Sequence, residues 1–442
     1  MGINLYALGG YSEVGRNMTA LDIDGEIIIL DMGLFIPAVI QYEEVQDFLS
    51  EKDMIRIKAV PDDGVLVSRK DDVKAIVIGH CHLDHVGGVP YLAKKYRRAA
   101  LVGTPFTISF LEIMLRDKNR KLSNRRKILN AGGVYQVSRN IDIEFVNITH
   151  STVNCVMMVI HTPYGQIVYS PDFKFDNHPV IGDKPDYAAL KSLDNVQALV
   201  LDSLYAKEDM KTPSEKVAKE MLKDVLLGTD NKGKAIIVTT FSSHIARLKT
   251  IIELGKKLNR KIVFLGRSLN KYTLAAEDAK IVKFSNQVEI VAYGNKIRNK
   301  LKHIMKEGVD KYLIVCTGNQ GEKGSVLVKM TNGIFPFTFH YEDHVIFSCR
   351  TIPVEENIKQ REKLEAKLKK YGCRIFTDVH VSGHGAREDD RDLINMLKPK
   401  KIIPAHGGKK ITQPAADLAE EMGYKIGKNV FLLKDGQKIK IV

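Results

Sequence analysis

A strand-like apolar run at residues 73–78 leads directly into a cluster of three histidines and one aspartate. His80, His82, Asp84 and His85 all fall between positions 80 and 85. Imidazole nitrogens and carboxylate oxygens are the ligands that Zn²⁺ prefers in hydrolytic sites. Because burying so many polar groups without a cation is costly, packing alone does not explain the cluster. The segment therefore predicts a metal site at the end of a buried strand.

The spacing within the cluster suggests two ions. Alternate residues of an extended segment point the same way, so His80 and His82 can bind one metal while Asp84 and His85, on the following turn, reach a second. Each ion needs further ligands, and the candidates are polar residues placed just after other apolar runs: His150, Asp172 and His406. Each of these three, taken alone, is equally readable as a helix cap or turn residue. Only their combination with the cluster predicts a two-metal centre.

Composition limits the class of protein. A chain of 442 residues with 44% hydrophobic and 27% charged residues is typical of a soluble globular protein with two or three folding units. Lys and Arg outnumber Asp and Glu by 67 to 53, which favours a polyanionic partner, although solubility alone explains such an excess in many proteins. The five cysteines lack CxxC spacing, and no targeting signal or membrane-spanning apolar run is present. We expect a cytoplasmic protein with no membrane association.

The order of the predicted elements indicates two domains. The first part is rich in strands, with Asp24-Gly25 forming a hairpin turn, and contains helices near residues 89–96 and 105–115. After Asp202, helical and apolar strand-like segments alternate, which is typical of βαβ units around a parallel sheet. Strand character resumes at 375–381 and 401–403, where histidines follow and suggest a return to the first domain. We therefore predict one discontinuous domain formed by residues 1–206 and 372–442. A second domain, residues 207–371, is inserted into it.

Several motifs together resemble a known superfamily. HCHLDH at 80–85, followed by His150, Asp172 and a late histidine, is similar to the metallo-β-lactamase superfamily. LDS at 201–203, VSGH at 381–384 and PAHG at 404–407 resemble motifs A, B and C of its β-CASP nucleases. Segments such as GRNM at 15–18, SPDFKFD at 170–176 and TGNQGE at 317–322 resemble the ribonuclease J family in its short archaeal form. Arg16, where Lys is common, and Asn154, where many relatives are acidic, depart from that pattern.

The resemblance implies an α/β fold, namely a metallo-β-lactamase αββα sandwich with an inserted β-CASP α/β domain. It implies a 5′-to-3′ exoribonuclease that hydrolyses single-stranded RNA, prefers a 5′-monophosphate and serves RNA decay and processing, and it leaves endonuclease activity open. It also implies a homodimer and two Zn²⁺ per chain, with manganese as the alternative metal. The expected ligands are His80, His82 and His150 for the first zinc, Asp84, His85 and His406 for the second, and Asp172 as the bridge.

The same motifs imply an acid–base pair. His384 is the expected proton donor to the departing ribose oxygen, and Asp202 is expected to orient its ring and support its charged form. We count Asp84 with them as a third catalytic residue. The alternative is that Asp202 caps the following helix and His384 lies in a glycine-flanked turn.

The terminal phosphate of the RNA needs hydrogen-bond donors. We expect them among backbone N–H groups and hydroxyls of a small set of residues: Ser242, Ser243, Ser382, Gly383, His384 and Gly385. Ser242 and Ser243 precede a predicted helix and are equally readable as N-caps. Basic residues of the inserted domain are expected to line an RNA channel through phosphate contacts.

Two other functions compete with this interpretation. A dinuclear zinc site on this fold also suits hydrolysis of a small thioester or lactam, but such a substrate needs neither an inserted domain nor a positive charge. A catalytically inactive RNA-binding scaffold is the second alternative, and the complete set of expected ligands argues against it.

Overall fold

The computed structural model describes residues 1–40, 49–352 and 355–442, and the chain divides into two compact units. The first unit comprises residues 1–177, 182–212 and 383–442, and the second comprises 178–181 and 213–382. The second unit thus interrupts the first. The inserted domain was predicted at 207–371, whereas the main segment of the second unit runs from 213 to 382.

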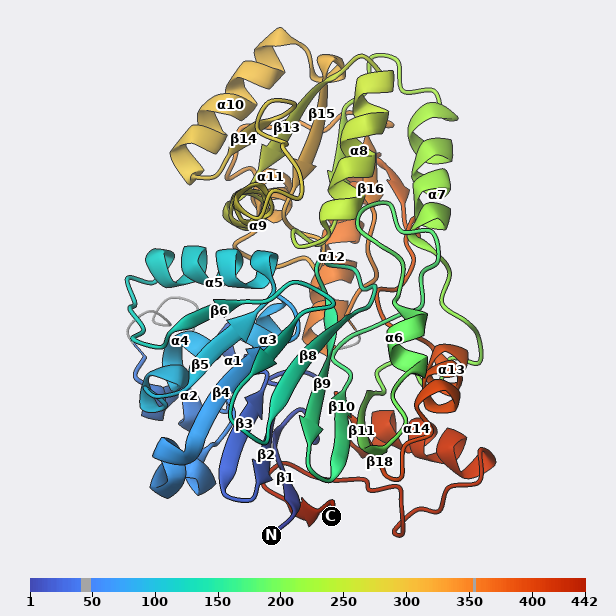
Figure 1. Cartoon of the computed structure of the whole chain (residues 1–442). Helices are drawn as coiled ribbons and strands as arrows, with labels where there is room; N and C mark the ends of the chain where they lie inside the picture. The colour runs from blue at the N-terminus through green and yellow to red at the C-terminus, as the bar shows by residue number, and fades with distance from the viewer. Residues whose placement is uncertain (41–48, 353–354) are drawn as a thin grey trace. The chain divides into compact units, whose positions relative to one another are not determined.

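The first unit contains two mixed sheets (Figure 1). The first sheet has the order β19-β1-β2-β3-β4-β5-β6, with parallel pairing from β3 to β6 and antiparallel pairing elsewhere. Its strands are β1 (Ile3–Gly9), β2 (Met18–Ile23), β3 (Glu26–Leu30), β4 (Val73–Ile78), β5 (Ala100–Gly103), β6 (Arg126–Ile128) and β19 (Lys438–Lys440). The predicted hairpin turn is present between β2 and β3, where Asp24 and Gly25 both take positive φ.

The second sheet has the order β18-β11-β10-β9-β8-β7. Its strands are β7 (Val134–Gln136), β8 (Asp142–Asn147), β9 (Val156–Thr162), β10 (Gly165–Tyr169), β11 (Val196–Asp202) and β18 (Ile402–Ala405). β11 pairs in parallel with both β10 and β18. The carboxyl ends of β11 and β18 therefore lie side by side at one edge of the sheet, with Asp202 paired to Ala405.

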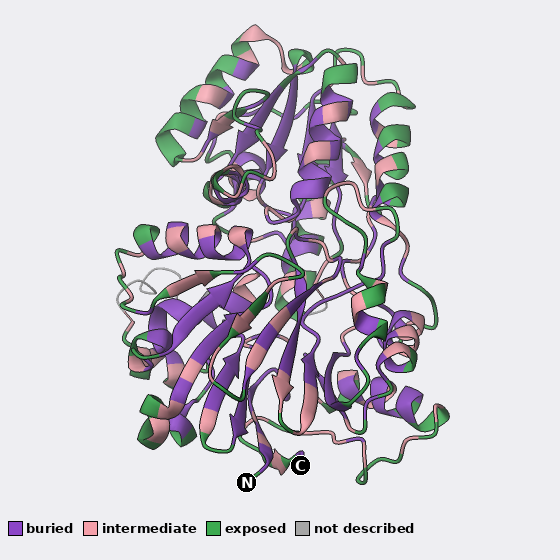
Figure 2. Ribbon diagram, viewed as in Figure 1, coloured by how far each residue is buried: buried purple, intermediate pink, exposed green. Residues whose placement is uncertain are grey.

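The two sheets pack on each other through their apolar faces. One buried cluster joins side chains from the first sheet, such as Leu5 and Val77, to side chains from the second, such as Phe145 and Val200. A second cluster packs the other face of the second sheet against α6 (Tyr187–Lys191), α13 (Arg387–Leu397) and α14 (Lys409–Glu421). Figure 2 shows the buried strands of both sheets in purple. Central strands such as β4, β5 and β11 read as nearly continuous apolar runs because both faces are covered.

Short helices complete the first unit. They are α1 (Ile36–Ile40), α2 (Glu51–Arg56), α3 (Leu83–Val86), α4 (Val89–Leu92) and α5 (Pro105–Asp117), with 3-10 segments at Gly64–Asp72 and Ala93–Lys95. The helix predicted at 89–96 is thus α4 followed by a 3-10 turn. No helix in the described part of the chain is long and apolar enough to cross a bilayer.

The second unit is a parallel sheet of order β14-β13-β15-β12-β16-β17. Its strands are β12 (Ile236–Thr239), β13 (Lys261–Leu265), β14 (Glu289–Val291), β15 (Tyr312–Cys316), β16 (His344–Phe347) and β17 (Arg374–Phe376). Its helices are α7 (Glu215–Leu227), α8 (Ile245–Lys257), α9 (Arg267–Asp278), α10 (Gly294–Glu307), α11 (Val326–Thr331) and α12 (Glu355–Lys370), with a 3-10 turn at Val309–Lys311. The predicted βαβ alternation is present.

One strand differs from the sequence expectation. The run from residue 375 was expected to return to the first domain, but β17 covers only Arg374–Phe376 and pairs with β16 in the third sheet. The physical reason is that α12 provides the crossover that two parallel neighbours require.

Candidate metal centre

The loop after β4 carries the histidine cluster. β4 is buried over most of its length, and the chain leaves it through Gly79, whose N–H donates to Asp31 Oδ1 at 2.9 Å. His82 keeps an extended backbone, with φ −68° and ψ 147°, and α3 begins at the next residue. The change from strand to helix turns Asp84 and His85 away from the direction of the preceding histidines, as the spacing predicted.

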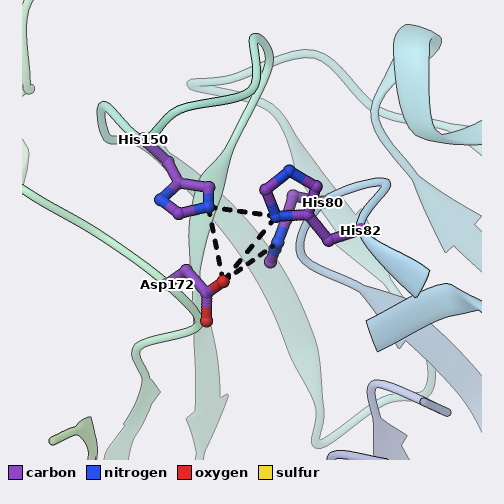
Figure 3. A group of neighbouring side chains, drawn as sticks. All are labelled: His80, His82, His150 and Asp172. Atoms are coloured by element: carbon purple, nitrogen blue, oxygen red, sulfur yellow. Dashed lines mark hydrogen bonds and ion pairs between the residues drawn. The ribbon is translucent and has the colours of Figure 1, made fainter. Parts of the chain in front are cut away.

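The first group of candidate ligands is His80, His82, His150 and Asp172, whose ligand atoms all lie within 4.8 Å of one another. Figure 3 shows the three imidazoles gathered around one carboxylate oxygen. Asp172 Oδ2 lies 3.4 Å from His80 Nε2, 3.3 Å from His150 Nε2 and 3.8 Å from His82 Nδ1. The group thus presents three nitrogens and one oxygen to a common point.

The second group is Asp84, His85, Asp172 and His406. Asp172 Oδ1 lies 3.0 Å from His85 Nε2 and 3.3 Å from His406 Nδ1. Asp84 Oδ2 lies 3.7 Å from His85 Nε2 and 3.6 Å from His406 Nε2. Asp172 therefore faces one group with each of its two oxygens, which is the arrangement that a bridging ligand requires.

His406 reaches the second group from a strained backbone. It follows β18 with φ of +64°, in the left-handed region that residues with a Cβ seldom adopt. Such a conformation costs about 1–3 kcal/mol and persists mainly where the surrounding structure imposes it. The backbone N–H of the next residue, Gly407, donates to Gly10 O at 3.0 Å, which anchors the turn that presents the imidazole.

The residues of this centre fit a metal ion. Both ring nitrogens of His80 and Oδ1 of Asp172 are buried and make no hydrogen bond to any described residue. Leaving such atoms without a partner costs about 1–3 kcal/mol each, more for a charged group. A divalent cation in the first group would give His80 Nε2 a partner, and one in the second group would give Asp172 Oδ1 a partner. The mixed nitrogen and oxygen donors suit zinc.

The pKa shifts of His80, His150 and Asp172 favour the forms that bind metals. Burial lowers the pKa of His80 to about 3 and lowers the pKa of His150 well below its usual value. Burial alone would raise the pKa of Asp172, but the neighbouring histidines, His85 foremost, hold it well below its usual value. Neutral imidazoles and an ionised carboxylate are the forms that bind metals.

Polar groups behind the ligands fix their orientation. His85 Nδ1 lies 2.6 Å from Asp31 Oδ2, and His150 Nδ1 donates to Gly383 O at 2.7 Å. The Asn17 side chain donates to Asp84 O at 3.1 Å. Such outer partners set the tautomer and the ring angle of ligating histidines. The sequence analysis missed Asp31, although it follows the apolar strand β3 directly and so obeys the rule that identified the other ligands.

The predicted acid–base pair is present as a close contact. His384 Nδ1 lies 2.8 Å from Asp202 Oδ2, and His384 Nε2 lies 3.6 Å from Asp172 Oδ2. Burial would lower the pKa of His384, but the carboxylates of Asp172 and Asp202 outweigh burial and raise it to about 9. One ring nitrogen of His384 is thus directed at the metal centre, and the other is held by Asp202.

A buried carboxylate joins the segments that carry these residues. Asp389, fully buried on α13, accepts hydrogen bonds from the backbone N–H groups of Thr212 at 2.8 Å, Ala386 at 3.1 Å and Phe175 at 3.4 Å. These three positions follow Asp202, His384 and Asp172, respectively, along the chain. Asp389 was not predicted, because nothing in the sequence indicates which backbone groups it contacts.

The residues predicted to bind the 5′-phosphate are divided between the units. Ser242, Ser243 and Ser382 belong to the second unit, whereas Gly383, His384 and Gly385 belong to the first. α8 begins at Ile245 with His244 at its N-cap position, so neither serine occupies that position. The phosphate site stays a prediction.

Comparison with known proteins identifies related chains. Family models match three segments: a β-lactamase superfamily domain at residues 57–226, a ribonuclease J β-CASP domain at 233–362, and a Zn-dependent metallo-hydrolase RNA specificity domain at 371–432. Ribonuclease J of Methanocaldococcus jannaschii is 45% identical over 441 residues, covering 99% of this chain and 98% of that protein. Ribonuclease J of Pyrococcus abyssi is 42% identical over 443 residues, covering 99% and 97%.

More distant proteins are similar over the whole chain. Ribonuclease J 1 of Streptococcus pyogenes is 30% identical over 455 residues, covering 99% of this chain and 74% of that protein. A crystal structure of a protein of unknown function from Enterococcus faecalis V583 matches with a TM-score of 0.67 at 16% identity, covering 99% of both chains. At that identity the likeness concerns the fold alone.

Proposed function

This chain belongs to the ribonuclease J family, and from that premise we propose that it is a metal-dependent ribonuclease that degrades single-stranded RNA from the 5′ end. Its fold is the predicted one, a metallo-β-lactamase domain with an inserted β-CASP domain. The observation that carries the proposal is Asp172, whose two oxygens face two separate groups of candidate ligands.

The metals proposed are two Zn²⁺ ions. His80, His82 and His150 would hold the first, Asp84, His85 and His406 the second, and Asp172 both. The choice of zinc is supported by the donor set of five imidazoles and two carboxylates, and manganese is the alternative. Two such ions supply an activated water at neutral pH and stabilise the charge that develops on the phosphoryl oxygens.

The chain's own residues supply the proton transfers. His384 donates its Nε2 proton to the departing ribose oxygen, and Asp202 holds the opposite ring nitrogen so that Nε2 keeps its direction. Asp84 has a side chain 21% exposed, the largest exposure among the carboxylates of the centre. Its exposed side is suited to hold the attacking water.

The direction of RNA degradation, from 5′ to 3′, and the preference for a 5′-monophosphate are proposed from the family. The 5′-monophosphate would be held by Ser242, Ser243 and Ser382 together with Gly383, His384 and Gly385. We also propose from the family that the enzyme is cytoplasmic, that it acts as a homodimer and that it serves RNA decay and processing.

The test is a cleavage time course on RNA labelled at its 3′ end and carrying a 5′-hydroxyl, 5′-monophosphate or 5′-triphosphate. The proposal expects progressive shortening from the 5′ end, fastest with the monophosphate, and none with an Asp84→Ala/His85→Ala variant that stays folded. Discrete internal fragments formed regardless of the 5′ group would overturn the exonuclease assignment. Hydrolysis of a thioester or lactam without RNA cleavage would favour the small-substrate alternative, and binding without cleavage would favour a scaffold.

A further inference from the structure

The positive charge of the chain is concentrated in the second unit. Residues 213–382 contain 31 Lys and Arg against 18 Asp and Glu, whereas the rest of the chain contains 36 against 35. Almost all of the net charge of +14 therefore lies on a unit that holds none of the proposed metal ligands. Such a charge attracts polyanions over a distance, so exposed cations of this unit are candidates for contact with a polyanion.

Helix α10 presents a row of cations to solvent. Arg298, Lys302 and Lys306 are exposed and lie at i, i+4 and i+8, whereas Ile297, Leu301 and Ile304 form the buried side of the helix. A rise of about 1.5 Å per residue places neighbouring members about 6 Å apart along the helix. We call these three residues the α10 ridge.

The charges of the ridge are not neutralised within the described part of the chain. The two acidic residues nearest in the fold have other partners: Glu289 pairs with Lys300 at 2.6 Å, and Glu307 pairs with Lys261 and His303. Like charges spaced four apart destabilise a helix, so the row is unfavourable for α10 itself.

Another exposed helix of the same unit shows the usual solution. In α12, the exposed side chains of Lys359 and Glu355 pair with each other within one turn. A solvated helix face commonly alternates charges in this way. Within α10, by contrast, no acidic residue lies three or four positions from Arg298, Lys302 or Lys306.

Neighbouring groups strengthen the ridge. The Arg298 guanidinium and the Lys329 ammonium from α11 each lie 5.8 Å from the centroid of the Phe335 ring, which brings two cations to one aromatic side chain. Tyr293, directly before α10, is 60% exposed and provides a ring on which a base can stack.

We propose that the α10 ridge binds the phosphates of a single RNA strand, at nucleotides other than those at the scissile bond. A line of evenly spaced cations complements a backbone of evenly spaced phosphates, and contacts to phosphates carry no sequence information. The proposal rests on the proposed ribonuclease function and adds to it a second place where the substrate is held.

The test compares two triple variants of the whole chain. Arg298→Gln/Lys302→Gln/Lys306→Gln removes the ridge, and Gln matches Lys and Arg in helix propensity, so α10 stays folded. Lys363→Gln/Lys369→Gln/Lys370→Gln removes the same charge from exposed positions of α12 and serves as the control. For each, kcat/KM is measured against salt concentration on an RNA of about 30 nucleotides and on one of about 4, lengths that bracket the usual site sizes of single-strand binding modules.

On the long RNA, kcat/KM of the ridge variant should fall about tenfold or more. The slope of log kcat/KM against the logarithm of salt concentration should become shallower by about 2, or about 0.7 per lost contact. On the short RNA it should match the wild-type chain. Tyr293→Ala should weaken action on the long RNA without changing the salt slope, because stacking is not electrostatic.

Three results would contradict the proposal that the α10 ridge binds RNA. Equal losses in the ridge and α12 variants would mean that only the overall field matters, and no loss in the ridge variant would mean that RNA does not touch it. Equal loss on the short RNA would place the ridge at the scissile bond. A wild-type chain that cleaves neither RNA would instead refute the proposed function.

Discussion

Asp31 Oδ2 lies 2.6 Å from His85 Nδ1, and this contact leaves His85 Nε2 facing Asp172 Oδ1 at 3.0 Å. Asp31 is fully buried, and its other oxygen accepts the Gly79 N–H that begins the histidine loop. A single carboxylate thus fixes both the tautomer of one candidate ligand and the start of the loop that carries four of them.

Asp31→Asn should lower metal affinity by about 10-fold to 100-fold, because partners behind ligating histidines usually contribute that much. Competition with a chelator, followed by metal analysis, measures the change. Asp22→Asn is the matched control, since Asp22 pairs with Arg69 in the same unit and contacts none of the candidate ligands. Equal metal affinity in the two variants would show that Asp31 does not orient His85.

His384→Ala should reduce kcat for RNA cleavage by about 10²-fold to 10⁴-fold, the usual contribution of a positioned general acid, while bound metal stays constant. Asp202→Asn should have a smaller effect in the same direction, since it only orients the ring. Rate measurements combined with metal analysis separate these effects. His161→Ala, which removes a partly exposed histidine paired with Glu144, is the control. Loss of metal from His384→Ala would instead make His384 a ligand.

Substitutions of the neighbouring residues Asp389 and Asp390 should have opposite effects on the free energy of unfolding. Asp389→Ala removes three backbone hydrogen bonds to a buried carboxylate and should lower the free energy of unfolding by about 3 kcal/mol or more. Burial raises the pKa of Asp390 well above its usual value, and neither of its oxygens has a hydrogen-bond partner among the described residues. Asp390→Asn should therefore be neutral or stabilising. Chemical denaturation of both variants tests this contrast, and equal destabilisation would contradict it.

The second unit contains a pH-dependent ion pair. Arg247, fully buried, donates to both oxygens of Glu215 at 2.6 and 2.8 Å. Burial would raise the pKa of Glu215, but His244 and Arg247 hold it well below its usual value. The pair therefore contributes stability above the unfolded pKa of about 4.3, and this stability is lost as pH falls through the lower folded pKa.

Glu215→Gln should thus destabilise the chain most at neutral pH and progressively less below about pH 4. Unfolding of the whole chain by denaturant, repeated across this pH range for both proteins, measures the difference. A constant difference between wild type and variant at every pH would contradict the ion-pair account.

Much of the metal centre could be predicted because its ligands follow a simple rule. Strands β4, β10 and β18 end in apolar residues and β8 has an apolar inner face, and a polar residue shortly beyond each end reaches the centre. Asp31 obeys the same rule after β3. It was not predicted because no recognised motif includes that position. The βαβ order of the second unit was likewise predictable, from alternating periodicity.

The remaining features depend on contacts between segments far apart in sequence. Asp389 acts by accepting N–H groups of Phe175 and Thr212, and such pairings leave no pattern in the residues themselves. The pairing of β17 with β16 depends on where α12 returns the chain, which periodicity does not reveal.

Elemental analysis of the purified, active chain tests the central claim most directly. The account predicts two equivalents of zinc or manganese per chain, and cleavage of RNA that is lost on chelation and restored by adding the metal back. A chain free of transition metals that still cleaves RNA at its full rate would contradict it.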